Sequence, residues 1–344
     1  MQLKQSLLMA IALSVISLGA WELYWRSQGK TPNLDDNKDL WAVQRAKGNK
    51  ATADDVILTG SSRVLFDIQL NEWEKETGIR PIQLATAGAS PLPIFSDIVN
   101  NTNFKGTVLV GVTPPLFFST TYPLADPWYR AQNRTDYFQK RTYAQRFNHL
   151  LSIPLQKNLA LISTSEEKWN DNFDLKTLIN NIRIGERIPQ EMPPFYRFDN
   201  IDLDRNVEMT PRTVNDTAFA NTHKKVWGFF GKVSPPPDKK STMDFFVNDA
   251  KKFMERGGKI ILLRCPSTGG FRMGEKMVTP RAEFWDKLVD TLAVPSYHFE
   301  DYEPFKNLDC PEWSHLSAKD ARFFTTELVK ILKADGALTK SKTN

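Results

Sequence analysis

The sequence contains few of the residues that build metal sites and disulfide frameworks. Its 344 residues include four histidines and two cysteines, Cys265 and Cys310, and no Cys-x-x-Cys pair occurs. A structural zinc site needs a compact set of cysteine and histidine ligands, so we expect no metal centre. The cysteines leave two alternatives open, which are two buried free thiols or one disulfide formed in an oxidising compartment.

A strong excess of one charge is also lacking. Lysine and arginine number 45 against 40 acidic residues, and the net charge of +5 is spread without a basic stripe or an arginine-rich run. Nucleic-acid-binding domains concentrate positive charge on one face, so this pattern argues against a nucleic-acid partner. With 41% hydrophobic and 25% charged residues, the chain has the composition of a globular protein rather than a disordered one.

One long apolar run lies at the N-terminus. It covers Ser6–Trp21, follows Lys4 and continues into an aromatic cluster that includes Tyr24. A membrane-spanning helix needs about 20 apolar residues, and aromatic residues gather at membrane interfaces. We therefore expect residues 1–30 to be an uncleaved single-span anchor, with a cleaved signal peptide or a buried core helix as the alternatives. Either of the first two puts the remaining chain on the outer, periplasmic side of a bacterial-type inner membrane.

Short apolar runs that end in small or turn-forming residues alternate with amphipathic segments along the rest of the chain. The expected strands are Val56–Thr59, Pro81–Ala85, Thr107–Val112, Lys259–Leu263 and Ser296–Phe299. The expected helices are Asp67–Thr77, Ser90–Asn101, Thr242–Arg256, Pro280–Leu292 and Ser317–Ala334. This alternation predicts an α/β fold, a three-layer α/β/α sandwich with a mostly parallel five-stranded sheet. Functional side chains of such sheets gather at the carboxyl ends of the strands.

The segment 114–241 interrupts this alternation. It is rich in aromatic residues, arginine, asparagine and proline, and its helical patterns cover Tyr137–Leu151 and Leu175–Ile184. We interpret it as a long insertion after the third strand that covers the carboxyl edge of the sheet, with a separate small domain as the alternative. The expected organisation is one domain over 31–335, with its core at 55–122 and 242–335, and a polar tail at 336–344.

A serine follows the first expected strand and a histidine precedes the last expected helix. Ser62 ends the tripeptide Gly60-Ser61-Ser62, and His315 lies three residues after Glu312. A nucleophilic serine needs a base within hydrogen-bond reach, and that base needs an orienting acceptor. The combination therefore predicts a catalytic set of Ser62, His315 and Glu312, with Asp309 as the alternative acid.

These motifs resemble the SGNH (GDSL-type) hydrolase superfamily. The nucleophile block of that superfamily, Gly-x-Ser, matches Gly60-Ser61-Ser62, its second-block glycine matches Gly88, and its final Asp-x-x-His block matches Glu312-x-x-His315. The likeness covers 55–122 and 242–335. Because the chain also has the expected anchor and the double serine, it is similar to extracytoplasmic proteins that modify cell-wall polymers or exopolysaccharides, such as the D-alanyl-transfer and alginate-acetylation families.

The resemblance implies an SGNH/flavodoxin-like sandwich and a serine esterase or O-acyltransferase that needs no metal or organic cofactor. Its substrate would be a glycan or cell-envelope acyl ester, and a membrane-embedded acyl-transfer protein would be a partner. The oxyanion hole would consist of the Ser62 backbone N–H, Gly88 and Thr113. The alternative is a catalytically inactive SGNH-like envelope protein that binds a polysaccharide or that membrane partner.

Two positions depart from the superfamily pattern. The third block, Gly-x-Asn-Asp, reads Gly111-Val112-Thr113-Pro114 here, so a threonine stands where an asparagine usually donates to the oxyanion. Loss of one oxyanion donor lowers the rate by about 10²–10³-fold. The acid is Glu312 instead of aspartate, and triads with glutamate exist.

Two arginines and the two cysteines also follow strands or precede the histidine. Arg63 and Arg264 are expected either to bind an anionic part of the substrate or to form a structural ion pair. Cys265 follows the fourth expected strand and Cys310 lies in the loop before His315. The fold brings these two places together, and we expect a disulfide between them that holds the histidine loop.

Overall fold

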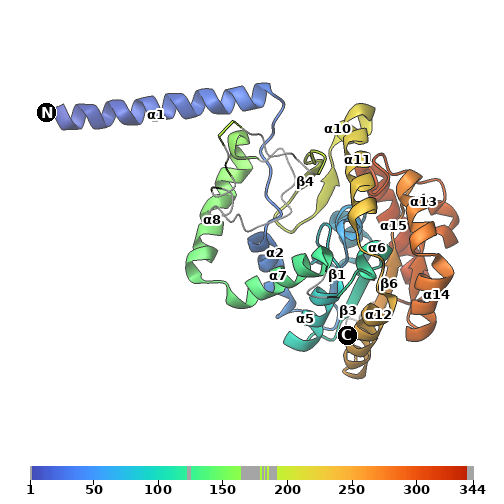
Figure 1. The fold of residues 1–344 in the computed structure, drawn as a ribbon. Coiled ribbons are helices and arrows are strands. Elements are labelled where there is room, and N and C mark those ends of the chain that lie inside the picture. Colours follow the sequence, from blue (N-terminus) through green and yellow to red (C-terminus); the bar gives the residue numbers. More distant parts are fainter. Residues whose placement is uncertain are drawn as a thin grey trace.

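The computed structural model describes residues 2–121, 125–163, 179, 182, 184–185 and 192–338. Its centre is a parallel five-stranded sheet in the order β2-β1-β3-β6-β7 (Figure 1). The strands are β1 (Val56–Thr59), β2 (Ile82–Gln83), β3 (Thr107–Gly111), β6 (Lys259–Arg264) and β7 (Ser296–His298). This confirms the predicted α/β sandwich with a parallel five-stranded sheet.

Helices cover both faces of the sheet, because its strands are apolar on both sides. In β1, Val56 and Leu58 belong to one core cluster, whereas Ile57 belongs to the other. The first cluster includes residues of α3 (Ser62–Asp67), α4 (Leu70–Thr77) and α15 (Ala318–Ala334). The second includes residues of α2 (Lys38–Gly48), α5 (Leu92–Asn101), α12 (Lys239–Glu255) and α14 (Arg281–Leu292). Burial on both faces explains why these strands read as continuous apolar runs.

The helix expected over Asp67–Thr77 is two helices, and the first begins earlier than predicted. Ser61 caps α3, its hydroxyl accepting a hydrogen bond from the Arg63 backbone N–H, so helical geometry starts at Ser62. The chain becomes extended at Ile68 before α4 begins, and α4 ends at Gly78 in the left-handed conformation with φ of 78°. Ser62 therefore lies in the first turn of a helix rather than in a loop before one.

The insertion contains several helices and a hairpin. In the described residues these are α6 (Pro114–Phe117), α7 (Asp126–Lys140), α8 (Tyr143–Asn158), η1 (Ala160–Ile162), the antiparallel strands β4 (Asp199–Ile201) and β5 (Val207–Met209), α10 (Pro211–Asn215) and α11 (Thr217–Val233). The helix expected over Tyr137–Leu151 is divided, because Thr142 and Gln145 form a capping box that starts α8. The helix expected over Leu175–Ile184 lies almost entirely outside the described residues.

The N-terminal helix α1 (Gln2–Ser27) extends away from the domain (Figure 1). It is long and apolar enough to cross a membrane, and its apolar span is not buried against the rest of the chain. A helix of this length extends about 39 Å, against about 30 Å for the hydrocarbon layer of a bilayer. The alternative of a buried core helix is therefore wrong, whereas an anchor and a signal peptide both fit the helix.

Among the described residues, the hydrogen bonds between α1 and the domain lie at the C-terminal end of α1. The Glu22 carboxylate accepts bonds from the backbone N–H groups of Ala160 (2.9 Å) and Leu161 (2.8 Å) in η1. Arg26 donates a hydrogen bond of 2.8 Å to the carbonyl oxygen of Asn158, the last residue of α8. These contacts hold the insertion beside the point where α1 joins the domain.

Candidate active site

Ser62, His315 and Glu312 meet at the carboxyl edge of the sheet. Ser62 Oγ lies 2.8 Å from His315 Nε2, and His315 Nδ1 lies 3.0 Å from Glu312 Oε1. His315 is 1% exposed and Glu312 is fully buried, whereas Ser62 is half-buried. These distances suit proton transfer from the hydroxyl to the ring and stabilisation of the protonated ring by the carboxylate. The serine is the member of the set that a substrate can reach.

The turn that presents Ser62 depends on a glycine. A Cβ atom at Gly60 would lie 2.6 Å from Cγ2 of Val64, which is too close for any larger residue. Because Gly60 has no Cβ atom, Val64 can pack against the turn and β1 can pass directly into α3. The sharp passage from strand to helix puts the Ser62 hydroxyl at the sheet edge, where a nucleophile is accessible.

Glu312 is held in place by three kinds of donor. Its Oε1 accepts bonds from the backbone N–H groups of Ser314 (3.1 Å) and His315 and from the His315 ring, and its Oε2 accepts a bond of 2.6 Å from the Trp227 indole. Burial acts to raise the pKa of Glu312, but the neighbouring His315 and the hydrogen bonds from His315 and Trp227 outweigh burial and lower the pKa. These contacts favour the ionised form of Glu312. The alternative acid, Asp309, is exposed.

The insertion encloses the histidine ring. Phe198, next to β4, has its ring centre 5.6 Å from that of His315, and Trp227 of α11 lies at 6.0 Å. Phe66 of α3 completes the enclosure at 4.6 Å. The sequence pattern predicted no role for these aromatic residues. A tryptophan on the apolar side of a helix in the insertion was the available signal, but the sequence does not reveal which buried acceptor its indole reaches.

The loops that carry the expected oxyanion donors lie against the serine turn. The Thr86 N–H donates to the Gly60 carbonyl (3.0 Å), which fixes the loop containing Gly88, and the Thr113 hydroxyl lies 2.7 Å from the Ser61 hydroxyl. Thr113 therefore pairs with the first serine rather than with Ser62. Its proton is free for an oxyanion only when Ser61 is the donor of that bond. Gly88 has a φ of 60°, and its carbonyl accepts a bond of 2.9 Å from Arg130.

Arg63 and Arg264 do not face the surface. Arg63 Nη1 lies 2.9 Å from Glu275 Oε1, Arg264 Nη2 lies 2.5 Å from Glu275 Oε2, and all three side chains are almost completely buried. Ser267 adds a hydrogen bond of 2.7 Å to the same carboxylate. Glu275 comes from α13 (Gly269–Val278), a helix that the sequence analysis did not predict. Of the two alternatives, these contacts show the structural ion pair and contradict the substrate clamp, because both guanidinium groups are directed at an internal anion.

The expected disulfide is also corrected. Cys265 and Cys310 are free, buried thiols. The histidine loop is instead held by Thr268, whose N–H donates to the Trp313 carbonyl (3.0 Å) and whose hydroxyl bonds to the backbone of Cys310. Burial raises the pKa of both thiols well above the ordinary value, and thiols of this kind are unreactive.

A buried carboxyl group, Asp67, supports the histidine loop. Its Oδ1 accepts a bond of 3.0 Å from the Leu316 N–H, whereas its Oδ2 has no hydrogen-bond partner among the described residues. Burial raises the pKa of Asp67 well above its ordinary value of 3.8. The folded protein thus binds this proton more tightly than the unfolded chain does, so the resulting stabilisation is complete below the unfolded pKa and is lost as pH rises toward the folded pKa.

We expect Asp67→Asn to stabilise the protein increasingly as pH rises. The amide keeps the acceptor for Leu316 and carries no charge at any pH, so the variant and the wild type should be similar at about pH 4 and differ by about 1–3 kcal/mol in free energy of unfolding at about pH 8. Denaturant unfolding of both proteins across this range measures the difference. A difference that is independent of pH would contradict the assignment of Asp67 as the titrating group.

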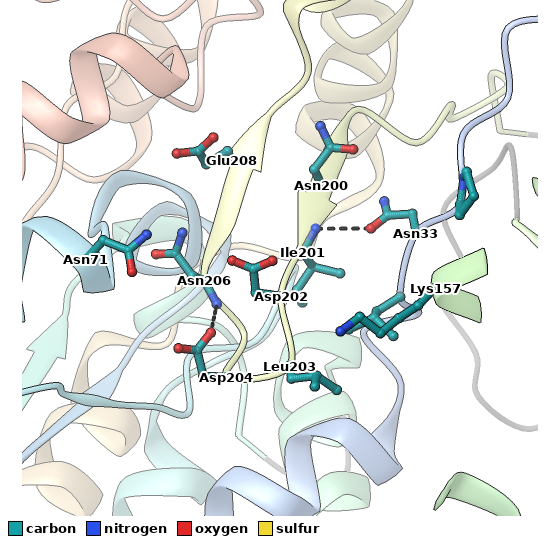
Figure 2. Close-up of a pocket in the computed structure, with 12 residues that line it drawn as sticks. Asn33, Asn71, Lys157, Asn200, Ile201, Asp202, Leu203, Asp204, Asn206 and Glu208 are labelled. Atoms are coloured by element: carbon teal, nitrogen blue, oxygen red, sulfur yellow. Dashed lines mark hydrogen bonds between the residues drawn. The ribbon is translucent and has the colours of Figure 1, made fainter. Parts of the chain in front are cut away.

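A cavity of about 670 Å³ lies beside the hairpin, and it does not include Ser62. Figure 2 shows its polar lining, in which Asn33 accepts a hydrogen bond from the Ile201 N–H, and Asp202, Asp204 and Glu208 project from the hairpin. None of its lining residues belongs to the serine site. The hairpin therefore lines this cavity, while Phe198, the residue before β4, packs on the His315 ring.

No family model matches this chain, and no curated protein matches it in sequence.

Proposed function

We propose that this protein is an SGNH-type serine esterase or O-acyltransferase that acts outside the cytoplasm on a glycan or cell-envelope acyl ester. The observation that carries the proposal is the continuous set of hydrogen bonds from the half-buried Ser62 hydroxyl through His315 to the ionised Glu312. A buried carboxylate, a histidine and an accessible serine in this order form an activated nucleophile.

In the proposed reaction, Ser62 Oγ attacks the acyl carbonyl carbon while His315 Nε2 takes the hydroxyl proton. The negative charge that develops on the carbonyl oxygen is stabilised by the Ser62 N–H, by Gly88 and by Thr113 when Ser61 donates to it. His315 then gives its proton to the leaving alcohol, and an acyl-serine remains. Water or a sugar hydroxyl, deprotonated by His315, then attacks the acyl-serine. His315 returns this proton to Ser62 Oγ as the bond from the acyl carbon to Oγ breaks, which completes an esterase or a transferase cycle respectively.

The proposed location and partners follow from α1. As an uncleaved anchor in the inner membrane, this helix would hold the domain at the periplasmic face of that membrane. The domain would then lie close to envelope polymers and to a membrane-embedded acyl-transfer partner. The mechanism uses no metal or organic cofactor.

One observation favours a second candidate function, a catalytically inactive envelope protein that binds a polysaccharide or the membrane partner. Thr113 stands in the place of the oxyanion asparagine, and its hydroxyl is paired with Ser61. A site with one fewer oxyanion donor is slower by about 10²–10³-fold.

Labelling with a fluorophosphonate probe tests the proposal. The full-length protein in detergent is expected to react covalently, and Ser62→Ala and His315→Ala are expected to abolish the reaction. Ser241→Ala is the matched control, because Ser241 is an exposed serine of α12 that lies outside the serine site. A folded wild type that does not react would overturn the catalytic proposal and favour the binding function.

A further inference from the structure

The helix α8 has an uncovered apolar face. Five large side chains at helical spacing, 52–87% exposed, form a single stripe along it: Tyr143, Phe147, Leu150, Leu151 and Leu155. Residues at i, i+4, i+7, i+8 and i+12 lie on one side of a helix. The opposite side faces the domain, where His149 is buried and Gln156 accepts a hydrogen bond from the Asp35 N–H. For the described part of the chain, this face is a contiguous apolar surface, and such surfaces mark sites of interaction.

The position of α8 relative to α1 identifies what this face meets. Trp21, Tyr24 and Trp25 pack on one another near the C-terminal end of α1, and aromatic clusters of this kind lie at the level of the lipid headgroups. Glu22, at the same level, binds the N–H groups of η1 directly after α8. When α1 spans a bilayer, the C-terminal end of α8 is therefore fixed at the membrane interface.

The direction of α8 fits the same surface. In Figure 1, α8 runs across the direction of α1, on the side of the domain that faces back along α1. An amphipathic helix in this position lies in the interface plane with its apolar side chains among the upper acyl chains. The helix has no acidic residue, and it carries Arg146 and Lys157, both exposed. Cations beside an apolar stripe complement anionic headgroups.

We propose that α8 is a second, interfacial membrane contact, which binds the outer surface of the bilayer that α1 spans through its Tyr143–Leu155 stripe. The occupant is lipid, because the stripe continues the membrane contact of α1 and lies at the depth of its aromatic cluster. The two contacts together fix the tilt of the domain on the membrane, which a single helix followed by a short linker does not. This proposal rests on the proposed role of α1 as an uncleaved anchor and is independent of the chemistry of the serine site.

Depth measurements on the full-length protein test this proposal. A nitroxide is attached to Leu151→Cys or Leu155→Cys in protein reconstituted into vesicles of phosphatidylethanolamine and phosphatidylglycerol; the native cysteines are buried and react poorly. Met277→Cys on α13 is the matched control, because Met277 is equally apolar, is 77% exposed and lies on a helix at the opposite side of the domain in Figure 1. Collision rates with oxygen and with a water-soluble nickel chelate then report the depth of each label.

The expected result is immersion of the α8 labels by about 5–10 Å, with oxygen favoured over the nickel chelate, while the label at Met277 favours the chelate. Equal exposure of both positions to the chelate would overturn the proposal. Shielding of the α8 labels from both reagents would also overturn it, because that pattern indicates cover by protein, such as a second copy of the chain. With α1 as the proposed anchor of the full-length protein, loss of the α8 contact would not remove a variant from the vesicles, so absence of the wild type from the vesicles would count against the anchor and not against α8.

Discussion

Glu312→Gln is expected to lower the rate of acyl transfer from Ser62 by about 10⁴-fold while the protein stays folded. Both carboxylate oxygens accept hydrogen bonds, Oε1 from the His315 ring and nearby N–H groups and Oε2 from Trp227. A glutamine amide must point its NH₂ group at one of these donors. In both orientations the negative charge that stabilises the protonated ring is lost. When the NH₂ group faces the ring, it also donates to Nδ1 and selects the tautomer whose Nε2 already carries hydrogen, so His315 cannot accept the Ser62 proton.

The measurement is the second-order rate of fluorophosphonate labelling, or of hydrolysis of an activated acyl ester, for Glu312→Gln beside the wild type. Asp309→Asn is the matched control, because it removes an exposed acid three residues earlier in the same loop and should leave the rate unchanged. A loss of less than about tenfold in Glu312→Gln, with the fold intact, would show that the carboxylate does not orient the histidine.

Glu275→Gln is expected to give the largest loss of stability, about 3–5 kcal/mol of unfolding free energy. The substitution leaves Arg63 and Arg264 buried without their anion, and removal of one partner from a buried ion pair costs far more than the net contribution of the pair. Since domains are stable by only about 5–15 kcal/mol in total, such a variant is close to unfolding at ambient temperature.

Denaturant unfolding in detergent, followed by tryptophan fluorescence, measures this effect. Glu303→Gln is the matched control, because Glu303 pairs with Lys306 on the surface and exposed pairs contribute little. A loss of less than about 1 kcal/mol for Glu275→Gln would mean that the two arginines reach solvent and would reopen their assignment as a substrate clamp.

The fold was predictable because its signals are local. Val56–Thr59, Thr107–Gly111 and Lys259–Arg264 are short apolar runs closed by small or turn-forming residues, and buried parallel strands have this form. The order of Ser62, Glu312 and His315 relative to these elements also indicated which side chains meet, because the carboxyl ends of parallel strands share one edge of the sheet. The predicted start of the helix at Asp67 was wrong, because α3 begins at Ser62 with Ser61 as its cap. In the sequence, neither of the two adjacent serines is distinguished as the cap of a helix.

The points that the sequence left open or predicted wrongly concern partners that lie far apart in the chain. Arg63 and Arg264 follow strands as substrate-binding residues do, and only the position of α13 reveals that Glu275 neutralises both. Cys265 and Cys310 lie on neighbouring segments, but proximity does not set the orientation of two thiols, and backbone bonds to Thr268 hold the loop instead. Trp227 was overlooked because its indole finds its acceptor 85 residues away.

The sequence by itself determined the sheet, the N-terminal helix and the identity of the serine, histidine and acid that come together, because local periodicity and strand order carry that information. Only the tertiary structure decided that the insertion reaches the site through Trp227 and Phe198, that the arginines are in an internal ion pair, and that the apolar side of α8 faces away from the core. The physical reason is that burial and charge pairing depend on which distant segments pack together. The sequence of a predicted helix does not reveal whether protein, water or lipid contacts each of its side chains.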